Sequence, residues 1–220
     1  MSVFNNELSL QSSIESVLNQ SFKDFEFLIM DDCSTDNSYN ILKDYESKDS
    51  RIKVFRNLEN IGLTKSLNVL IEKSERSLIA RQDGDDQSHN LRFEKQINYL
   101  IKGKYDFCVS RAKIIQSQKN IPKFSYLFPK KRIIKYKNPF IHGTLFIKKQ
   151  TIEKIGCYDE NFYYSQDYKL FSDLLKNDVS FKYLKIPLYY LNIKDNISSI
   201  NKDEQEYYAD CVRTNKQPNL

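Results

Sequence analysis

A single stretch near the start of the chain decides the fold, because in it an apolar run ends in acidic and hydroxyl residues. The stretch reads Phe25-Glu26-Phe27-Leu28-Ile29-Met30-Asp31-Asp32-Cys33-Ser34-Thr35-Asp36. Its first half is rich in Phe, Ile and Leu, which is typical of a strand, and turn-forming residues follow directly. Asp36 is placed to cap a helix that would carry Ile41, Leu42 and Tyr45. A strand that runs into a turn and then a helix is the repeating unit of α/β folds.

The same unit recurs on both sides of this stretch. Further strand-like runs occur at 52–55, 78–80 and 107–109. Three segments between the strands have apolar residues at i, i+4, i+7 and i+8, starting from Leu10, Leu63 and Phe93. That spacing predicts helices with one apolar stripe. Because such alternation implies right-handed crossovers, we predict an α/β fold with a mostly parallel central sheet flanked by helices.

The first strand is short in this pattern. Only Met1-Ser2-Val3-Phe4 precedes the first helical segment, and these residues resemble the last third of a strand. Ligands bind at the carboxyl ends of the strands in a parallel sheet. We therefore expect the functional end of this strand to be present and its body to be truncated at the N-terminus.

The second half of the chain is less regular. Residues 111–139 predict loops and small strands. We then expect a strand-like run at 140–147, helices at 150–155 and 165–177, and an extended segment at 182–191. The polar residues after Ile200 predict a loosely held tail, which Tyr207 and Tyr208 could dock.

Composition narrows the class of protein. The 220 residues include 5 Gly and 5 Pro, and neither G-x-G-x-x-G nor G-x-x-x-x-G-K-[ST] occurs, so a glycine-rich phosphate loop is not expected. No apolar run approaches the roughly 20 residues that span a bilayer, and no signal peptide opens the chain, so we expect a cytoplasmic protein. The 4 cysteines are widely spaced and His occurs twice, which predicts buried reduced thiols rather than zinc or a disulfide framework.

Basic residues are concentrated in one place, within a formal net charge of +5. The run Lys130-Lys131-Arg132 continues through Lys135 and Lys137, with Ile133, Ile134 and Tyr136 interleaved. A solvated loop or strand face is the ordinary interpretation. The alternative is contact with an acidic membrane surface or an anionic lipid acceptor, and we expect no nucleic-acid partner.

Two acidic clusters directly follow strands. Asp31 and Asp32 follow the run at 25–30, and Asp83-Gly84-Asp85-Asp86 comes shortly after the run at 78–80. Carboxylates gathered at strand ends repel one another unless a cation compensates, and Mg²⁺ or Mn²⁺ would do so with hard oxygen ligands and substrate phosphates. This favours a nucleotide diphosphate as ligand. Turn formation or helix capping remains the alternative, and it is stronger for Asp31 and Asp32 than for the second cluster.

A third acidic position is Asp167, which opens a helix after the aromatic run Phe162-Tyr163-Tyr164. A carboxylate near a helix N-terminus is stabilised by the helix dipole, so an N-cap is the simple interpretation. The functional interpretation is a general base that removes a proton from an incoming hydroxyl.

Taken in order, these segments resemble family 2 glycosyltransferases of the GT-A fold. The motifs that carry the resemblance lie at 13–20, 22–26, 31–36, 60–63 with Asn68, 79–86 with Arg92, 142–146, 155–160 and 166–168. The resemblance covers roughly residues 1–190. It implies one GT-A domain at 1–200, with a nucleotide-binding half at 1–110 and an acceptor-side half at 111–200, followed by a polar tail at 201–220.

The resemblance also implies roles for individual residues. Ser2, Phe4 and Asp32 should meet the base and ribose, with Phe4 standing where the family usually has Tyr. Asp83 and Asp85 match the family's DxD pair. Asp85 is then the direct ligand of Mn²⁺ or Mg²⁺, and Asp83 lies nearer the ribose and contributes to the metal site. Asp167 matches the catalytic base. His142 matches a histidine at the back of the donor site, although Gly143 replaces the usual Pro.

The activity implied by the resemblance is that of a metal-dependent, inverting hexosyl- or N-acetylhexosaminyltransferase. It would move a sugar from a nucleotide-diphosphate sugar to a hydroxyl of a glycan or lipid-linked acceptor. We expect a role in surface polysaccharide biosynthesis, in capsule, O-antigen or lipooligosaccharide, with peripheral contact at the cytoplasmic face of the inner membrane as a possibility.

Two other functions compete with this one. The short first strand could leave a poorly built nucleotide pocket, in which case the protein would be an inactive glycosyltransferase remnant that acts at most as a binding module. A nucleotidyltransferase that activates a sugar phosphate would also use paired acids on an α/β sheet. The segment Asn5-Asn6-Glu7-Leu8 lacks the Gly- and basic-rich loop expected of such enzymes.

Overall fold

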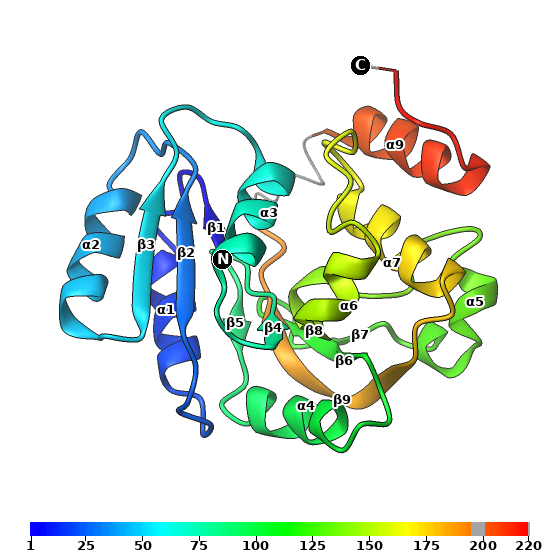
Figure 1. Ribbon diagram of the computed structural model, residues 1–220, viewed down its shortest axis with the longest axis horizontal. Helices are drawn as coiled ribbons and strands as arrows, with labels where there is room; N and C mark the ends of the chain where they lie inside the picture. The colour runs from blue at the N-terminus through cyan, green and yellow to red at the C-terminus, as the bar shows by residue number, and fades with distance from the viewer. Residues whose placement is uncertain (195–200, 220) are drawn as a thin grey trace.

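A parallel three-stranded sheet forms the N-terminal half of the protein. The structure, a computed structural model, describes residues 1–194 and 201–219. The strands are β1 (Ser2–Val3), β2 (Phe27–Asp31) and β3 (Ile52–Arg56), in the order β1-β2-β3. Three helices flank them, α1 (Leu10–Leu18), α2 (Ser38–Lys48) and α3 (Leu63–Lys73). Figure 1 shows α1 and α2 beside this sheet and the N-terminus at its inner edge.

A second, mixed sheet forms the other half. Its order is β4-β8-β6-β9-β5, and β7 pairs with β6. The strands are β4 (Leu78–Ala80), β5 (Gln87–Ser88), β6 (Phe107–Ile114), β7 (Asn120–Ile121), β8 (Phe146–Lys148) and β9 (Phe181–Leu191). Only the β6–β9 pair is parallel in this sheet, and the other pairs are antiparallel. The parallel arrangement that we predicted therefore applies to the first sheet.

Helices cover both faces of the second sheet (Figure 1). They are α4 (Arg92–Ile101), α5 (Lys130–Ile133), α6 (Lys149–Lys154), α7 (Gln166–Lys176) and α9 (Lys202–Thr214), with short 3-10 turns at Ser125–Leu127 and His142–Thr144. Among the described residues, no helix combines the length and the apolar character needed to cross a membrane.

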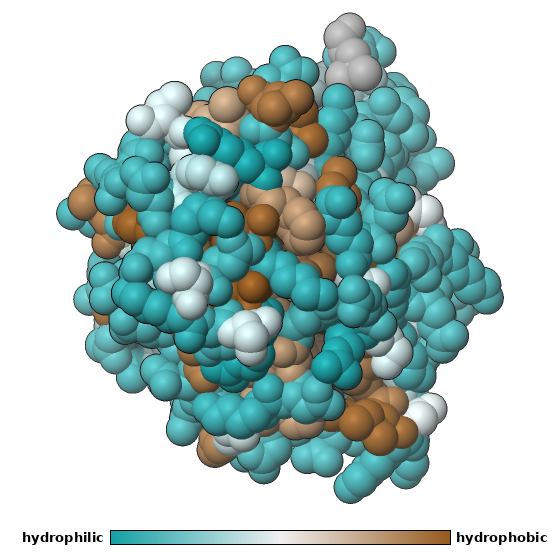
Figure 2. Space-filling view, turned by 60° about the vertical axis from the view of Figure 1, so that its left-hand side comes forward, coloured by the Kyte–Doolittle hydropathy of each residue, from teal (hydrophilic) through white to brown (hydrophobic). Residues whose placement is uncertain are grey.

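The apolar stripes predicted from the sequence form the core. One cluster packs Ile14 of α1 and Phe93 of α4 against Ile29 of β2 and Phe146 of β8. The other surrounds Phe171 of α7, which contacts Phe140 with ring centroids 4.6 Å apart. The face seen in Figure 2 is mostly hydrophilic, and its apolar side chains lie in separate patches. Burial of these stripes is the main force that holds the two sheets and their helices together.

Most predicted elements are confirmed, with small shifts at their ends. Residues 140–147 are a correction: we expected one strand, but a 3-10 turn at His142–Thr144 comes first and β8 begins at Phe146. The cap of α2 is also shifted, since its N-cap is Asn37. The Asp36 carboxylate still accepts a hydrogen bond from the Ser38 N–H at 2.9 Å.

The segment after Ile200 also differs from expectation. Residues 202–214 form α9, which packs on α7 and buries Cys211 and Val212 in the core. This segment is therefore not loosely held. Its sequence is polar because only one narrow face of the helix is buried.

The four cysteines are free thiols, as predicted. Cys108 and Cys211 are buried, whereas Cys33 and Cys157 are half-buried, so the expectation of burial is met by two of the four.

Candidate functional site

The ends of β1 and β2 bring three predicted residues together. Val3 pairs with Asp31, and the N–H of Asp32 donates to the carbonyl of Val3 at 2.8 Å. Ser2 and Phe4 therefore flank the start of the loop that follows β2. The Phe4 ring is 45% exposed, so it is available to a flat ligand.

The carboxylate of Asp32 holds the loop that follows β3. Its two oxygens accept hydrogen bonds from Asn57 Nδ2 at 2.7 Å and from the N–H groups of Ile61 and Gly62 at 3.0 and 2.9 Å. Gly62 has a φ of +87°, a conformation that glycine adopts at little cost. Asp32 is buried, and in this conformation it shapes one wall of the site.

The second acidic cluster lies in the loop between β4 and β5, and distant parts of the chain fix it. The carbonyl of Asp83 accepts from Ser13 Oγ of α1 at 2.7 Å, and its N–H donates to the Tyr189 hydroxyl at 3.0 Å. Asp86 accepts from the N–H of Asn192 at 2.6 Å. A Cβ at Gly84 would lie 3.1 Å from Asn6 Oδ1, so the loop packs tightly on the segment after β1.

The three carboxylates of this loop differ in charge state. Asp83 forms an ion pair with Arg81, whose charge outweighs the effect of burial and keeps the pKa of Asp83 below its ordinary value. Burial, with the charge of Asp83, raises the pKa of Asp85 to about 6. Burial and the charges of Asp83 and Asp85 raise the pKa of Asp86 to about 8. The loop therefore carries more negative charge than the protein neutralises.

The donor set of this loop fits a divalent cation that also contacts substrate. In residues 1–194 and 201–219, no group of three or more His, Cys, Asp or Glu side chains is placed to hold a metal. Asp85 is half-buried, and within the same ranges no Lys or Arg pairs with it. One or two carboxylates with phosphate oxygens and water is the coordination that Mg²⁺ and Mn²⁺ commonly take.

Asp167 lies in the first turn of α7, where it is half-buried. Its Oδ2 accepts from Asn138 Nδ2 at 2.8 Å, and its Oδ1 accepts from the N–H of Tyr168 at 2.7 Å. Burial raises the pKa of Asp167, and the negative charge of Asp83 adds to the effect. A carboxylate with a raised pKa is a better proton acceptor than an ordinary Asp.

The start of α7 is held by the C-terminal helix. Ser165, the N-cap of α7, is in the left-handed conformation with a φ of 51°. Its hydroxyl donates to the carbonyl of Gln205 in α9 at 2.9 Å. The position of Asp167 therefore depends on residues about 40 positions further along the chain.

His142 lies in the 3-10 turn before β8. Its Nε2 is 2.7 Å from the Tyr158 hydroxyl. Burial and the positive charge of Arg81 lower the pKa of His142 to about 3, so the imidazole is neutral. A neutral imidazole serves as a hydrogen-bonding group rather than as a charge.

The predicted site residues thus form two groups. One lies at the ends of β1 and β2, and the members of the other act on one another through their charges. Ser2, Phe4 and Asp32 adjoin one another, and the charge of Asp83 affects the pKa of both His142 and Asp167. Four further residues take part that sequence reasoning did not single out: Arg81, Asn138, Tyr158 and Tyr189. Arg81 lies next to the acidic loop in the sequence, so an ion pair between its basic side chain and that loop could have been predicted. Asn138 and Tyr189 gave no comparable signal.

Solved structures of similar fold define the class of protein. The chain has the GT-A fold. Its TM-score is 0.77 to S. aureus TarS 1-349 in complex with UDP-GlcNAc, at 19% identity, over 91% of this chain and 59% of that one. It is 0.74 to the mannosyltransferase PcManGT from Pyrobaculum calidifontis in complex with GDP-Man and Mn²⁺, at 12% identity, over 99% of this chain and 64% of that one.

Sequence comparison then gives the family. The profile of "Glycosyl transferase family 2" matches residues 1–156, and the chain belongs to this family. It is 32% identical over 214 residues to the O-antigen biosynthesis glycosyltransferase WbnJ of Escherichia coli. This match covers 94% of this chain and 83% of WbnJ. It is 35% identical over 161 residues to the putative glycosyltransferase EpsE of Bacillus subtilis (strain 168), over 72% of this chain. The match spans 58% of EpsE, less than two thirds of its length.

Proposed function

We propose that this protein transfers a sugar from a nucleotide-diphosphate sugar to a hydroxyl of a glycan or lipid-linked acceptor. The observation that carries the proposal is the division of charge in the site. Asp83 is paired with Arg81, Asp85 is paired with no Lys or Arg of the described residues, and Asp167, on α7, has a raised pKa. The acidic loop would then serve a metal-bound diphosphate, and Asp167 would serve as the proton acceptor.

The donor would bind where β1, β2 and β4 end. Phe4 would stack on the base, Ser2 and the loop held by Asp32 would line the nucleotide, and Asp83 would lie near the ribose. Asp85, with Asp83, would hold Mn²⁺ or Mg²⁺, which supplies neutralisation of the charge on the departing diphosphate. Neutral His142 would close the back of this pocket. The similarity to proteins solved with UDP-GlcNAc and with GDP-Man and Mn²⁺ supports such a donor.

Asp167 would act as the general base. The amide of Asn138 and the N–H of Tyr168 orient its carboxylate toward one fixed geometry. Asp167 would take the proton of the acceptor hydroxyl as that oxygen bonds to the anomeric carbon and the diphosphate leaves from the opposite face. Such a single displacement inverts the anomeric configuration.

The acceptor would belong to a surface polysaccharide. WbnJ, which the chain matches over most of its length, is described as an O-antigen biosynthesis glycosyltransferase. The division into a nucleotide-binding half at 1–110 and an acceptor-side half at 111–200 is part of this proposal. The sugar itself would be a hexose or an N-acetylhexosamine.

We further propose that the acceptor-side half contacts an anionic membrane surface. Between Arg111 and Ile152 the chain has eleven Lys or Arg residues and no Asp or Glu. Four large apolar side chains in the middle of this stretch are 60% exposed or more, namely those of Phe124, Leu127, Phe128 and Tyr136. Exposed apolar groups beside lysines are the features that bind the interface of an anionic bilayer. Asn138, the partner of Asp167, lies within this stretch, so a lipid-linked acceptor would arrive beside the base.

One correction concerns the basic run itself. Lys130 is not part of a solvated face, because it is buried in α5 and its Nζ donates to the carbonyls of Ser125 and Phe128 at 2.8 and 3.1 Å. Burial lowers the pKa of Lys130 to about 8. Its neighbours Lys131 and Arg132 are exposed.

Vesicle sedimentation tests the membrane contact. The protein should sediment with vesicles that contain anionic phospholipid and not with purely zwitterionic ones. Replacement of both Phe124 and Phe128 by Ser should reduce binding at least tenfold, whereas Leu58→Ser, at an exposed site elsewhere, should not. Equal binding by all three proteins would contradict the proposal.

Thermal-shift screening tests the proposed activity. A panel of nucleotide sugars with Mn²⁺ should contain one donor that raises the melting temperature, and that donor should be consumed in the presence of acceptor. Binding without turnover would favour the alternative, an inactive remnant that acts as a binding module. If no donor binds, both possibilities fail.

A further inference from the structure

A fully buried arginine lies behind the acidic loop. Arg92 is the first residue of α4, and its side chain has no exposed surface. Burial lowers the pKa of Arg92 to about 10, so the guanidinium keeps its charge at neutral pH. In the described part of the chain its hydrogen bonds all go to uncharged oxygens. A buried charge is costly, and an apolar side chain would fill the same space without this cost, so the arginine is explained by its hydrogen bonds.

All five N–H donors of this guanidinium are used. Its Nη2 donates to the carbonyl of Arg81 at 2.7 Å and to that of Leu145 at 3.3 Å. Its Nη1 donates to Ser88 Oγ at 2.8 Å and to Gln82 Oε1 at 3.3 Å. Its Nε donates to Gln96 Oε1 at 3.0 Å, one turn further along α4. A rigid plane that is bonded at five points fixes its partners relative to one another.

These partners lie at both ends of the acidic loop. Arg81 directly follows β4 and precedes Asp83, and Ser88 belongs to β5, where the loop ends. Leu145 directly follows the 3-10 turn that carries His142. One side chain therefore joins the two ends of the acidic loop to each other and to the turn of His142.

The side chain of Gln82 extends this hold into the loop. Its Oε1 accepts from Arg92, and its Nε2 donates to the carbonyls of Asp83 and Asp86 at 3.1 and 2.9 Å. These two carbonyls lie on either side of Asp85 in the sequence. A displacement of the guanidinium would thus be passed through one amide to the backbone around Asp85.

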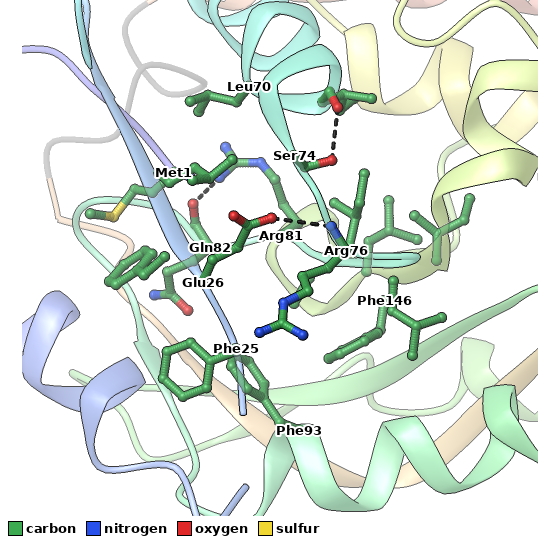
Figure 3. A pocket seen from close by; sticks show the side chains of 18 of the residues that line it. Met1, Phe25, Glu26, Leu70, Ser74, Arg76, Arg81, Gln82, Phe93 and Phe146 are labelled. Carbon is green, nitrogen blue, oxygen red and sulfur yellow. Dashed lines mark hydrogen bonds between the residues drawn. The ribbon is translucent and has the colours of Figure 1, made fainter. Parts of the chain in front are cut away.

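The opposite side of this segment is not closely packed. Arg81 and Gln82 line a cavity of about 280 Å³ between the two sheets (Figure 3). In Figure 3 the two residues lie side by side, and the Arg81 side chain donates a hydrogen bond to the Gln82 carbonyl. Close packing fixes the backbone in most protein interiors. Because the cavity removes such packing on one side, the hydrogen bonds of Arg92 are the main restraint on the other.

We propose that Arg92 is the positioning residue of the acidic loop, and that its five hydrogen bonds set the geometry in which Asp83 and Asp85 meet a divalent cation. The inference rests on the proposed function, in which these two carboxylates hold the metal. Arg92 is buried and contacts neither metal nor substrate. Its charge has the sign that repels a cation, so its contribution to metal binding is geometric.

Two substitutions separate the geometry of Arg92 from its charge. Arg92→Lys keeps the charge, but lysine has three donors on one nitrogen in place of five in a rigid plane. At most three of the five acceptors could stay bonded. Arg92→Met removes both the charge and all the donors while it keeps a long apolar stem. Loss of the charge alone would strengthen the binding of a cation, whereas loss of the geometry would weaken it.

Mn²⁺ binding by the folded protein is the first test. Mn²⁺ is titrated in the presence of UDP or GDP, well below the melting temperature of every variant, and free Mn²⁺ is followed by its electron paramagnetic resonance signal. Both Arg92→Lys and Arg92→Met should bind Mn²⁺ about 10–100-fold more weakly than the wild type, which is the usual effect of losing a residue that orients metal ligands. Equal or tighter binding by either variant would overturn the proposal.

A core substitution on the same helix controls for stability. Leu100 is buried in α4 and belongs to the apolar cluster, away from the five acceptors of Arg92. Leu100→Ala should lower the melting temperature and leave Mn²⁺ affinity unchanged. If it weakens Mn²⁺ binding as much as Arg92→Lys does, lower stability explains both effects and the positioning role is wrong.

Hydrogen exchange of the metal-free protein is the second test. The amides of Asp83 and Ser88 are bonded to Tyr189 and Ser16. Relative to the amide of Ile29 in β2, both should exchange at least tenfold faster in the lysine variant than in the wild type. The alanine control on α4 should show the wild-type ratio. An unchanged ratio in the lysine variant would mean that the loop is held without the arginine, and would also overturn the proposal.

The two tests keep this inference apart from the proposed function. If the wild type binds no Mn²⁺, the proposed metal role is wrong, and the exchange ratios still decide whether Arg92 holds the loop. If neither Arg92 variant folds, Ser88→Ala makes a milder change, because it removes one acceptor that Arg92 and Gln82 share. It should weaken Mn²⁺ binding and speed exchange at Asp83, and a variant that changes neither would contradict the proposal.

Discussion

The ring of Tyr189 occupies the space that a side chain at position 143 would need. A Cβ on Gly143 would lie 2.4 Å from the ring carbons and hydroxyl of Tyr189. The same hydroxyl accepts a hydrogen bond from the N–H of Asp83. Gly143 therefore allows one aromatic residue to connect the turn that carries His142 with the loop that carries Asp83 and Asp85. This contact gives a physical reason for glycine at position 143.

Gly143→Ala should lower both stability and donor binding. The added methyl group must displace Tyr189, and overpacking of this kind costs about 1–3 kcal/mol. For a protein of this size each kcal/mol lowers the melting temperature by about 2–4 °C. Calorimetry and donor titration measure the two effects. Gly103→Ala is the matched control: its φ of +74° makes it strained, but no neighbour lies within 4 Å, so it should lower stability and leave donor binding unchanged.

Asp167→Asn should abolish transfer and leave donor binding intact. The amide keeps the size of the side chain and cannot accept the proton, so a loss of about 10²–10⁴ in kcat is expected. Turnover assays and thermal shift with the donor measure the two properties. Asp173→Asn, on the same helix and paired with Lys169, should retain turnover. Wild-type turnover by Asp167→Asn would show that another group is the base.

The rate should fall on the acidic side at a pH above the ordinary value for an aspartate. Burial raises the pKa of Asp167, so its basic form is lost at a higher pH than the usual value of about 3.9. The Asn138 amide donates to the carboxylate and opposes this shift. Asn138→Ala should therefore move the acidic limb of the pH–rate profile to higher pH. If the acidic limb does not move in the Asn138→Ala variant, the group that titrates in that limb is not Asp167.

Chelation should remove activity, and Mn²⁺ should restore it. If Asp85 is a ligand, Asp85→Asn should raise the Mn²⁺ concentration needed for half-maximal rate at least tenfold, because an amide oxygen is a weaker ligand than a carboxylate. Glu72→Gln, at an exposed site on α3, serves as control. Full activity in chelator would exclude a metal role for Asp85.

Asp86→Asn should stabilise the metal-free protein at neutral to alkaline pH. The folded-state pKa of Asp86 is about 8, above its unfolded value near 3.9. Its contribution to stability is therefore fully present below about pH 4 and is lost as the pH rises toward 8. An asparagine at position 86 cannot ionise, so the variant does not lose stability in this pH range. Its melting temperature should exceed that of the wild type by about 2–4 °C or more at pH 8 in chelator. A flat pH dependence of wild-type stability would contradict this.

The sequence was sufficient for the elements that depend on local pattern. The apolar stripes of α1, α3 and α4 and the short strands were predictable because period and propensity agree there. The helix α9 was not, since its buried face is limited mainly to Cys211 and Val212 and its remaining residues are polar. The segment at 140–147 was misassigned because its apolar residues serve the core through a 3-10 turn as well as a strand.

The site residues were predictable where they lie in contiguous motifs and unpredictable where the fold joins distant segments. Asp83, Asp85 and Asp167 were singled out by their places after a strand and at a helix start. Asn138 and Tyr189 take part only because the chain folds back by 29 and 106 residues to reach Asp167 and Asp83. A single sequence contains no pattern that would reveal contacts between residues so far apart. The roles of Asn138 and Tyr189 in the donor or acceptor site are predictions.

The distance in sequence between Asp83 and Tyr189 has a consequence for how the protein is made. A ribosome adds about 5–20 residues per second, so some 5–20 s pass between the synthesis of the acidic loop and that of the tyrosine that fixes it. During this interval β1, β2 and β3 are already synthesised, and so are Ser13 and Arg81, but the contacts of the acidic loop with Tyr189 and Asn192 are still missing. The order of translation thus delivers the acidic loop well before Tyr189 and Asn192, the two residues of the C-terminal part of the chain that hold it.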